Sequence, residues 1–390
     1  MLCFFNVGVF GVSLVCWLIA GLTAWGRFSD YCDVVAKVEG REAERKSSWR
    51  FEDGSMTRRL CLLLLLVLLT STSMAAPQLS GRREVEAEVS RLWDRRAFDE
   101  LDTLEKSLRS TNATSASGWP MLFMFYQALD SLPVLEGEGL ASLNKAETDT
   151  DKWLAKSPSS NFGRFLKIDF LMARAWRARG HGYANTVSAA QWKEFSAYMD
   201  EASEYLTRQK ASLSSNPNWY SAWLDIANAT SWPKPEYDEL LAEAVKRHGR
   251  YLPILIQVIL HRTPKWGGSY REMDDFIASS TLNIAPPERD ELYARQYSYA
   301  FEQSLFPDRA RSKVSCERWL RGYEEILRKY STSYNVNHAA FAAVACADKP
   351  VAARYLKQLG AQSPDLSVWG ADQDGAVAFF KARSWATGER

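Results

Sequence analysis

The residues best suited to bind a ligand are concentrated in one short loop between two predicted helices. A guanidinium pair, an imidazole, a phenol and an amide occur within nine positions: Arg177, Arg179, His181, Tyr183 and Asn185. Such a group could hold a carboxylate, a phosphate or a peptide end. The alternative is structural: Gly180 and Gly182 let the loop turn, because glycine reaches backbone conformations that strain other residues, while Tyr183 packs inward.

A second candidate is Trp266, within the sequence Pro-Lys-Trp-Gly-Gly. It could be an exposed stacking platform for a partner, or it could fill a gap between adjacent helical hairpins. The acidic pair Asp274-Asp275 is expected to lie on a solvated helix face rather than to act in catalysis.

No stretch of the chain specifies a reaction. Phosphate-binding glycine loops, Cys-x-x-Cys, His-Glu-x-x-His and Gly-x-Ser-x-Gly motifs do not occur. None of the four histidines has another His or Cys at metal-ligand spacing, so we expect packing or surface roles for them: His181, His248, His261 and His338. We therefore assign no catalytic residue, cofactor or metal.

Two cysteines, Cys316 and Cys346, lie in the main body of the chain. Each is fifteen residues from Ser331, where we expect a turn between two helices. Positions equidistant from the turn of an antiparallel hairpin lie opposite each other, and so this spacing predicts a disulfide. The alternative is a small buried Cys346 and an unpaired Cys316.

The N-terminus contains two hydrophobic segments. Leu2–Gly26 is uncharged and long enough to span a bilayer. The second segment starts at Met56 and has two arginines, a leucine run and Ser73-x-Ala75, which is the layout of a secretory signal peptide. One interpretation is that translation starts at Met56, and the other is a real membrane anchor at Leu2–Gly26. Both place the main body outside the cytoplasm, in the periplasm or beyond.

The charge balance bears on partners. The 390 residues contain 48 Lys/Arg and 47 Asp/Glu; eight and seven of these precede Pro77, which leaves 40 of each. A neutral main body gives no electrostatic reason to expect nucleic acid, and it indicates a membrane partner only if Leu2–Gly26 is an anchor.

Apolar stripes at i, i+3, i+4 spacing run through most of the chain from Arg82 on, without an alternating strand pattern. The spacing predicts an all-α fold of TPR-like stacked helical hairpins, an α-solenoid. We expect loops at residues 137–144 and a tail that frays beyond Phe380. The predicted organisation is an over-extended N-terminus or anchor (1–55), a signal peptide (56–75), an N-terminal helical region (76–158), a TPR-like domain (159–360) and a C-terminal tail (361–390).

Three segments also carry a family resemblance: Ala175-Trp176-x-Ala178-Arg179-Gly180-x-Gly182-Tyr183-Ala184, Pro264-x-Trp266-Gly267-Gly268-Ser269 and Tyr293-Ala294-Arg295. They resemble the bacterial domain of unknown function 4034 family, from about residue 159 to residue 360. The resemblance implies an exported, TPR-like helical protein and no particular activity.

These features favour an exported helical-repeat scaffold that binds a protein or peptide partner through a concave surface. The alternatives are an enzyme, such as a cell-envelope hydrolase with carboxylates in a groove, or a subunit of an envelope complex. The sequence favours a non-enzymatic role.

We predict that the mature protein begins near Ala76, because Ser73-x-Ala75 has the small residues that signal peptidases require. N-terminal sequencing of exported protein should find this end. Intact chain in the inner membrane that still carries Leu2–Gly26 would contradict the prediction.

Overall fold

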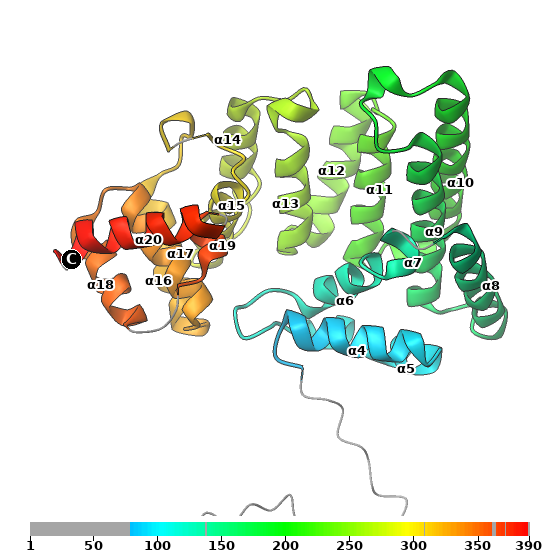
Figure 1. The fold of residues 1–390 in the computed structure, drawn as a ribbon, viewed down its shortest axis with the longest axis horizontal. Helices are drawn as coiled ribbons and strands as arrows, with labels where there is room; N and C mark the ends of the chain where they lie inside the picture. The colour runs from blue at the N-terminus through cyan, green and yellow to red at the C-terminus, as the bar shows by residue number, and fades with distance from the viewer. Residues whose placement is uncertain (1–78, 137–138, 308, 361–363, 371, 389–390) are drawn as a thin grey trace, which may run out of the picture. The chain divides into compact units, whose positions relative to one another are not determined.

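A computed structural model of the chain describes residues 79–136, 139–307, 309–360, 364–370 and 372–388. Within these ranges the protein is all-helical, with seventeen α-helices and no strand beyond an isolated bridge between Thr114 and Pro120 (Figure 1). The predicted leader and anchor segments lie outside the described residues. No helix in the described ranges combines the length and apolar character needed to cross a bilayer.

The first helices form a group around a shared apolar core. Val85, Val89 and Leu92 make the buried stripe of the first helix, as the spacing predicts, and this helix packs on the third. The second helix packs against α9 (Asn161–Arg179). The helices of this group are α4 (Arg82–Asp94), α5 (Phe98–Thr111), α6 (Met121–Asp130), α7 (Pro133–Glu136) and α8 (Leu140–Lys156). The expected loop at 137–144 is wrong from Leu140 on, because Leu143 and Ala146 begin the buried face of α8.

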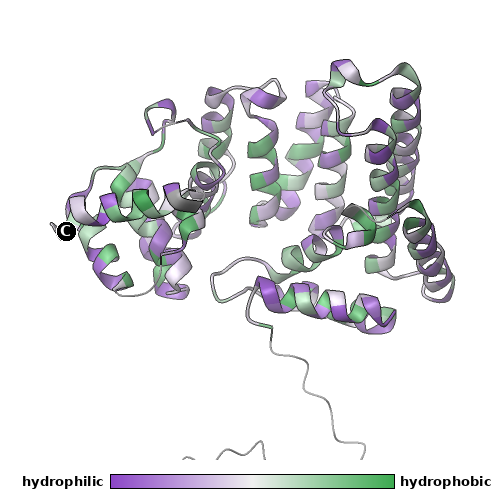
Figure 2. Ribbon diagram, in the orientation of Figure 1, coloured by the Kyte–Doolittle hydropathy of each residue, from purple (hydrophilic) through white to green (hydrophobic). Residues whose placement is uncertain are grey.

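The next helices lie side by side in chain order, each against its neighbour (Figure 1). At the N-terminus of the first of them, Ser188 and Gln191 form a capping box, in which each side chain accepts a hydrogen bond from the backbone N–H of the other residue. The most apolar helix is α13, which is buried on nearly all faces and is green along its length in Figure 2. These helices are α10 (Ala189–Leu213), α11 (Pro217–Ala229), α12 (Lys234–His248), α13 (Leu252–His261), α14 (Tyr270–Ser279) and α15 (Glu288–Glu302).

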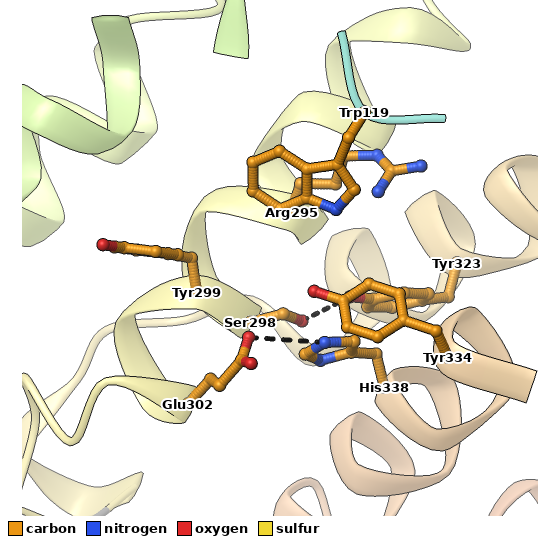
Figure 3. Close-up of a pocket in the computed structure, with 8 residues that line it drawn as sticks. All are labelled: Trp119, Arg295, Ser298, Tyr299, Glu302, Tyr323, Tyr334 and His338. Atoms are coloured by element: carbon orange, nitrogen blue, oxygen red, sulfur yellow. Dashed lines mark hydrogen bonds and ion pairs between the residues drawn. The ribbon is translucent and has the colours of Figure 1, made fainter. Parts of the chain in front are cut away.

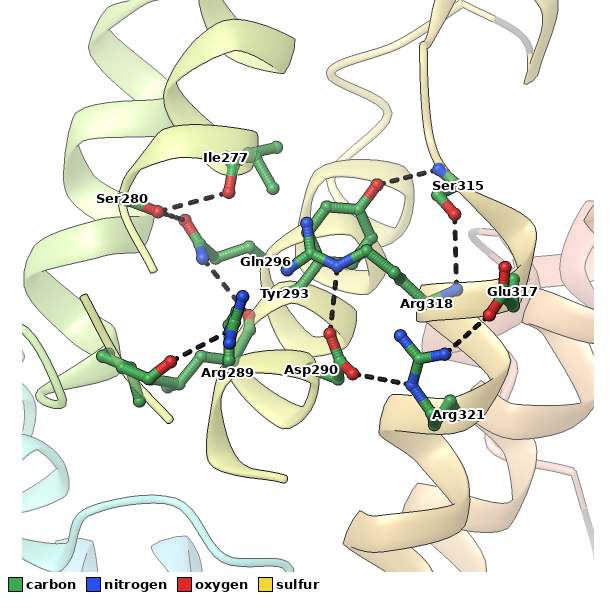
Figure 4. A network of polar contacts seen from close by, with 12 residues as sticks. Ile277, Ser280, Arg289, Asp290, Tyr293, Gln296, Ser315, Glu317, Arg318 and Arg321 are labelled. Carbon is green, nitrogen blue, oxygen red and sulfur yellow. Dashed lines mark hydrogen bonds and ion pairs between the residues drawn. The ribbon is translucent and has the colours of Figure 1, made fainter. Parts of the chain in front are cut away.

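Helix α15 makes a close and strongly polar contact with α16 (Cys316–Lys329). Gly322 permits the approach, since a Cβ at this position would overlap the carbonyl oxygen of Asp290. Asp290 accepts hydrogen bonds from Arg318 (3.0 Å) and Arg321 (2.7 Å), as Figure 4 shows. Burial raises the pKa of Asp290, but the two arginines outweigh it and hold the pKa below its ordinary value. This clamp fixes the register of α16 on α15.

The last helices are α17 (Ser333–Ala345), α18 (Lys349–Leu359), α19 (Leu366–Trp369) and α20 (Asp372–Thr387). The prediction that the tail frays beyond Phe380 is wrong. Helix α20 packs on α18 and α19, and the ring of Phe379 meets Trp369 edge-on at 5.4 Å. Trp369 in turn donates its indole N–H to Asn337 Oδ1 at 2.9 Å, which ties the tail to α17.

Cys316 and Cys346 form a disulfide, with their Cα atoms 5.8 Å apart. Cys316 is the first residue of α16, and Cys346 caps the C-terminus of α17. The turn between the two helices falls at residues 330–332, as the equidistance argument from Ser331 expects.

We predict that this bridge forms in solution and that its loss lowers the free energy of unfolding by about 3–4 kcal/mol, because the bridge restricts the unfolded chain. The comparison is between oxidised wild type and the Cys316→Ser/Cys346→Ser variant in urea. Ellman titration of the unfolded, unreduced protein beginning near Ala76 should find no free thiol, and two thiols per chain would contradict the bridge.

Candidate functional site

The loop that the sequence singles out connects α9 to α10, and Arg179 holds it together. Its Nη1 donates to the carbonyl oxygens of Gly180 (3.0 Å) and Gly182 (3.1 Å). The guanidinium also lies 5.6 Å from the ring centre of Trp176 and 5.2 Å from that of Trp192. Cation–π contact with both rings and two hydrogen bonds give Arg179 a structural role.

The other side chains of this loop do not converge on a site. Arg177 points to the first group of helices and donates to the carbonyl oxygen of Val134 at 2.9 Å. His181 and Asn185 are exposed, and Tyr183 is 86% exposed, so the expectation that Tyr183 packs inward is wrong. Gly180 has the predicted positive φ of 74°, but Gly182 does not have a positive φ.

Trp266 lies in the short 3-10 segment Pro264–Trp266 and is 54% exposed. Its nearest ring is that of His261, at 5.7 Å, and no contact among the described residues joins it to the α9–α10 loop.

The two residues of the acidic pair Asp274-Asp275 lie in different environments. Asp275 is exposed, but Asp274 is buried and accepts from the Tyr297 hydroxyl (2.7 Å) and the Lys313 amide (3.0 Å), which corrects the expectation of a solvated face.

The structure instead brings reactive side chains together in an interior recess, which we call the His338 recess (Figure 3). Its members come from the loop before α6 and from three helices near the C-terminal end of the chain. They are Trp119; Arg295, Ser298, Tyr299 and Glu302 of α15; Tyr323 of α16; and Tyr334 and His338 of α17.

Helical periodicity explains why these residues meet. Positions 295, 298, 299 and 302 follow i, i+3, i+4, i+7 spacing and so form one face of α15. Tyr334 and His338 are one turn apart on α17 in the same way. The sequence contains this signal, but the faces can be matched only when α15, α16 and α17 are known to be neighbours.

His338 is 2% exposed and lies between two tyrosine rings. The Tyr334 ring meets it edge-on at 4.5 Å, and the Tyr323 ring stacks at 6.1 Å. Neither ring nitrogen has a hydrogen-bond partner among the described residues. Burial lowers the pKa of His338 to about 3, and the nearby Arg295 cation acts in the same direction. The imidazole is therefore neutral at physiological pH.

Glu302 is the carboxyl group nearest to this histidine, with Oε2 3.5 Å from Nε2. Burial raises the pKa of Glu302 to about 7, and the negative charge of Asp365 adds to the rise. Glu302 and His338 therefore have opposite shifts with a common cause: the recess disfavours the charged form of each.

Arg295 is the one side chain of the recess that is charged at all physiological pH values. It is 7% exposed, and its Nη2 donates to the carbonyl oxygen of Ser117 at 2.7 Å. No described carboxylate lies within ion-pair distance of it. Its guanidinium lies 5.9 Å from the centre of the Tyr330 ring. Burial lowers the pKa of Arg295, and the opposing effect of nearby groups, which include Tyr323 and the Glu291 carboxylate, does not offset it.

A groove of about 460 Å³ adjoins the recess, and Trp119, Tyr299, Glu302 and Tyr334 line both. Phe123 of α6, Ile256 of α13 and further residues of α4, α15 and α19 complete its walls. The recess itself has room for about 10 Å³, or one water-sized group. The groove has the size of ordinary small-ligand sites, and its walls combine aromatic rings with polar side chains.

The geometry suits binding better than nucleophilic catalysis. The hydroxyl of Ser298, the nearest candidate nucleophile, accepts from Tyr323 (2.7 Å) and from the Trp319 indole (3.0 Å). No hydrogen bond joins it to His338, because neither ring nitrogen of His338 has a hydrogen-bond partner among the described residues. A serine nucleophile requires such a base within reach.

Comparison with known proteins finds a family match for part of this chain. Residues 86–248 match the family described as Domain of unknown function (DUF4034). The DUF4034 match begins and ends earlier than the resemblance predicted from the sequence, and it includes the segment from Ala175 to Ala184. Of the recess residues it contains only Trp119, because α15–α17 lie beyond it. A search of curated proteins finds no match to the chain.

Gly180 and His181 provide a test of the loop. We predict that Gly180→Ala lowers the free energy of unfolding by about 1–3 kcal/mol, because φ 74° with ψ 179° is a region that only glycine occupies without strain. His181 is exposed, so His181→Ala should change the free energy of unfolding by less than about 0.5 kcal/mol. Thermal or urea unfolding of both variants decides the matter, and a less stable His181 variant would show that this side chain holds the loop.

The recess predicts a pH dependence. His338 has a folded pKa of about 3 against an ordinary 6.5, so the stability that its neutral form supports is present above pH 6.5 and is lost as the pH falls toward 3. Glu302 has a folded pKa of about 7 against 4.5, so the stability from its protonated form is present below pH 4.5 and is lost as the pH rises toward 7. Between pH 4.5 and 6.5 the two effects oppose each other.

Glu302→Gln removes one of the two effects. We predict that this variant loses about 1.4 kcal/mol of unfolding free energy per pH unit, relative to wild type, as the pH falls from 6.5 to 4.5. Urea unfolding at several pH values measures the slope. Glu239→Gln, an exposed change on α12, is the matched control, and equal slopes for all three proteins would contradict the assignment.

Proposed function

We propose that this protein is an exported scaffold of TPR-like stacked helical hairpins that binds a protein or peptide partner in the cell envelope. The observation that carries the proposal is the groove of about 460 Å³ beside the His338 recess. A groove of this size accepts a few residues of an extended chain. Its aromatic walls match the preference of binding sites for tyrosine and tryptophan.

The stacked arrangement is supported by the order of contacts. Helices adjacent in the chain pack on each other, and α11, α13 and α15 also contact one another in succession. Such alternation of inner and outer helices is typical of helical-repeat proteins, whose inner helices form a binding surface. Export is supported by the signal-peptide pattern and by the disulfide, which is stable in an oxidising compartment.

Binding of the partner should require open space in the groove. Gln127→Trp places a large side chain in the groove and costs only an exposed hydrogen bond from Arg82. Glu201→Trp on the exposed face of α10 is the matched control. We expect immobilised wild type and the control to retain the same partner or peptides from envelope extract, and the groove variant to lose them at least tenfold. Equal retention by all three proteins would contradict a groove-dependent function.

One observation favours a second candidate, a cell-envelope hydrolase. Glu302 lines the groove with a pKa raised to about 7, which is the property of a general acid. Turnover of purified cell-wall material that Glu302→Gln abolishes would support this alternative. A partner that co-purifies at fixed stoichiometry would instead indicate a subunit of an envelope complex.

A further inference from the structure

The inference starts from the buried guanidinium of Arg295, which the fold leaves without an anionic partner. Of its five N–H donors, the structure pairs one nitrogen with the carbonyl oxygen of Ser117. Buried cations in proteins are normally paired with a carboxylate, because the desolvation of an isolated charge is costly. No described carboxylate lies within ion-pair distance, so the recess contains positive charge that a ligand can neutralise.

A second feature is the buried imidazole of His338, which is 2% exposed and lines the same recess. Among the described residues neither ring nitrogen has a hydrogen bond, and the Glu302 carboxyl lies 3.5 Å from Nε2. Buried polar groups are usually satisfied, and those that are not often mark a place for a ligand or a water molecule. In Figure 3, Arg295, Trp119, Tyr334 and His338 surround one small space.

The dimensions restrict what can enter. The recess admits one water-sized group, such as an oxygen of a carboxylate, whereas the body of a ligand must remain in the groove of about 460 Å³. Trp119, Tyr299, Glu302 and Tyr334 line both spaces and so lie where a ligand would pass from one to the other. When ionised, the Glu302 carboxylate repels a dianion such as phosphate. When protonated, the Glu302 carboxyl can donate a hydrogen bond to a monoanion.

We infer that Arg295 binds a carboxylate of the peptide that occupies the groove, with that carboxylate in the His338 recess. The inference rests on the proposed function and specifies the chemistry of its ligand. The carboxylate comes either from the C-terminus of the peptide or from an Asp or Glu side chain, and both would form the charge-assisted hydrogen bonds that guanidinium groups prefer.

The test uses pools of random octapeptides on the immobilised main body of the protein, with retention measured by mass spectrometry. One pool has free C-termini, a second has C-terminal amides, and a third has amides and lacks Asp and Glu. We expect the free-acid pool to be retained at least tenfold more than the third pool. The second pool assigns the source: retention equal to the first indicates a side-chain carboxylate, and retention equal to the third indicates the C-terminus.

Variants locate the effect. Arg295→Met should reduce the retention of the acid pool to that of the third pool. Asn335→Ala removes the other hydrogen bond to the Ser117 carbonyl, at 3.1 Å, and retains the guanidinium, so it should preserve the preference. If Arg295→Met fails to fold, the comparison of pools on wild type still decides. If wild type retains all three pools equally and Gln127→Trp loses them, the carboxylate inference is overturned and the proposed function stands. If wild type retains no pool, the inference is also overturned. The groove-dependent capture of envelope partners then tests the proposed function separately.

Discussion

The carbonyl oxygen of Ser117 is the point on which the arrangement around the recess depends. It accepts from Arg295 of α15 at 2.7 Å and from Asn335 of α17 at 3.1 Å. A loop near the start of the described chain is thereby attached to helices about 180 to 220 residues later. Hydrogen bonds from charged donors contribute about 1.5–3 kcal/mol, and their loss leaves a buried cation unsatisfied. Gly118, with φ 82°, lets the backbone turn here and lies against Tyr330 and Arg295.

This attachment places Trp119 beside the recess and brings α6 to the groove. Trp119 also packs against a small apolar cluster of α13 and α15 that includes Ile256 and Leu292. The groove therefore has walls from early and late segments of the described residues. Loss of the Ser117 contacts would remove one wall and leave the helices of the other wall in place, because α15–α17 pack on one another independently.

One disulfide and one ion-pair cluster, both outside the recess, join the helices that form it. The Cys316–Cys346 bridge joins α16 to α17, the helices that carry Tyr323, Tyr334 and His338. The Asp290 clamp joins α16 to α15, which carries Arg295 and Glu302 (Figure 4). Together they connect the three helices in a fixed register, so contacts away from the recess help to hold His338 and Arg295 in place. The DUF4034 match ends before these helices, so every recess residue except Trp119 lies outside the matched region.

The sequence by itself determined the helices, since apolar spacing and caps are local: Ser188 caps α10, Asn216 caps α11, and Gly180 ends α9 with a positive φ. The pairing of Cys316 with Cys346 also followed from the sequence, because two consecutive helices can meet in few ways. Tertiary packing decided the remainder. The contact between Phe379 and Trp369 stabilises α20, which continues beyond Phe380. Asp274 is buried and accepts a hydrogen bond from Tyr297, and Tyr183 is exposed. Tertiary packing also assembled the His338 recess from segments far apart in the chain. A helical stripe shows which face of a helix is buried, but the partner of that face depends on long-range contacts that no local pattern contains.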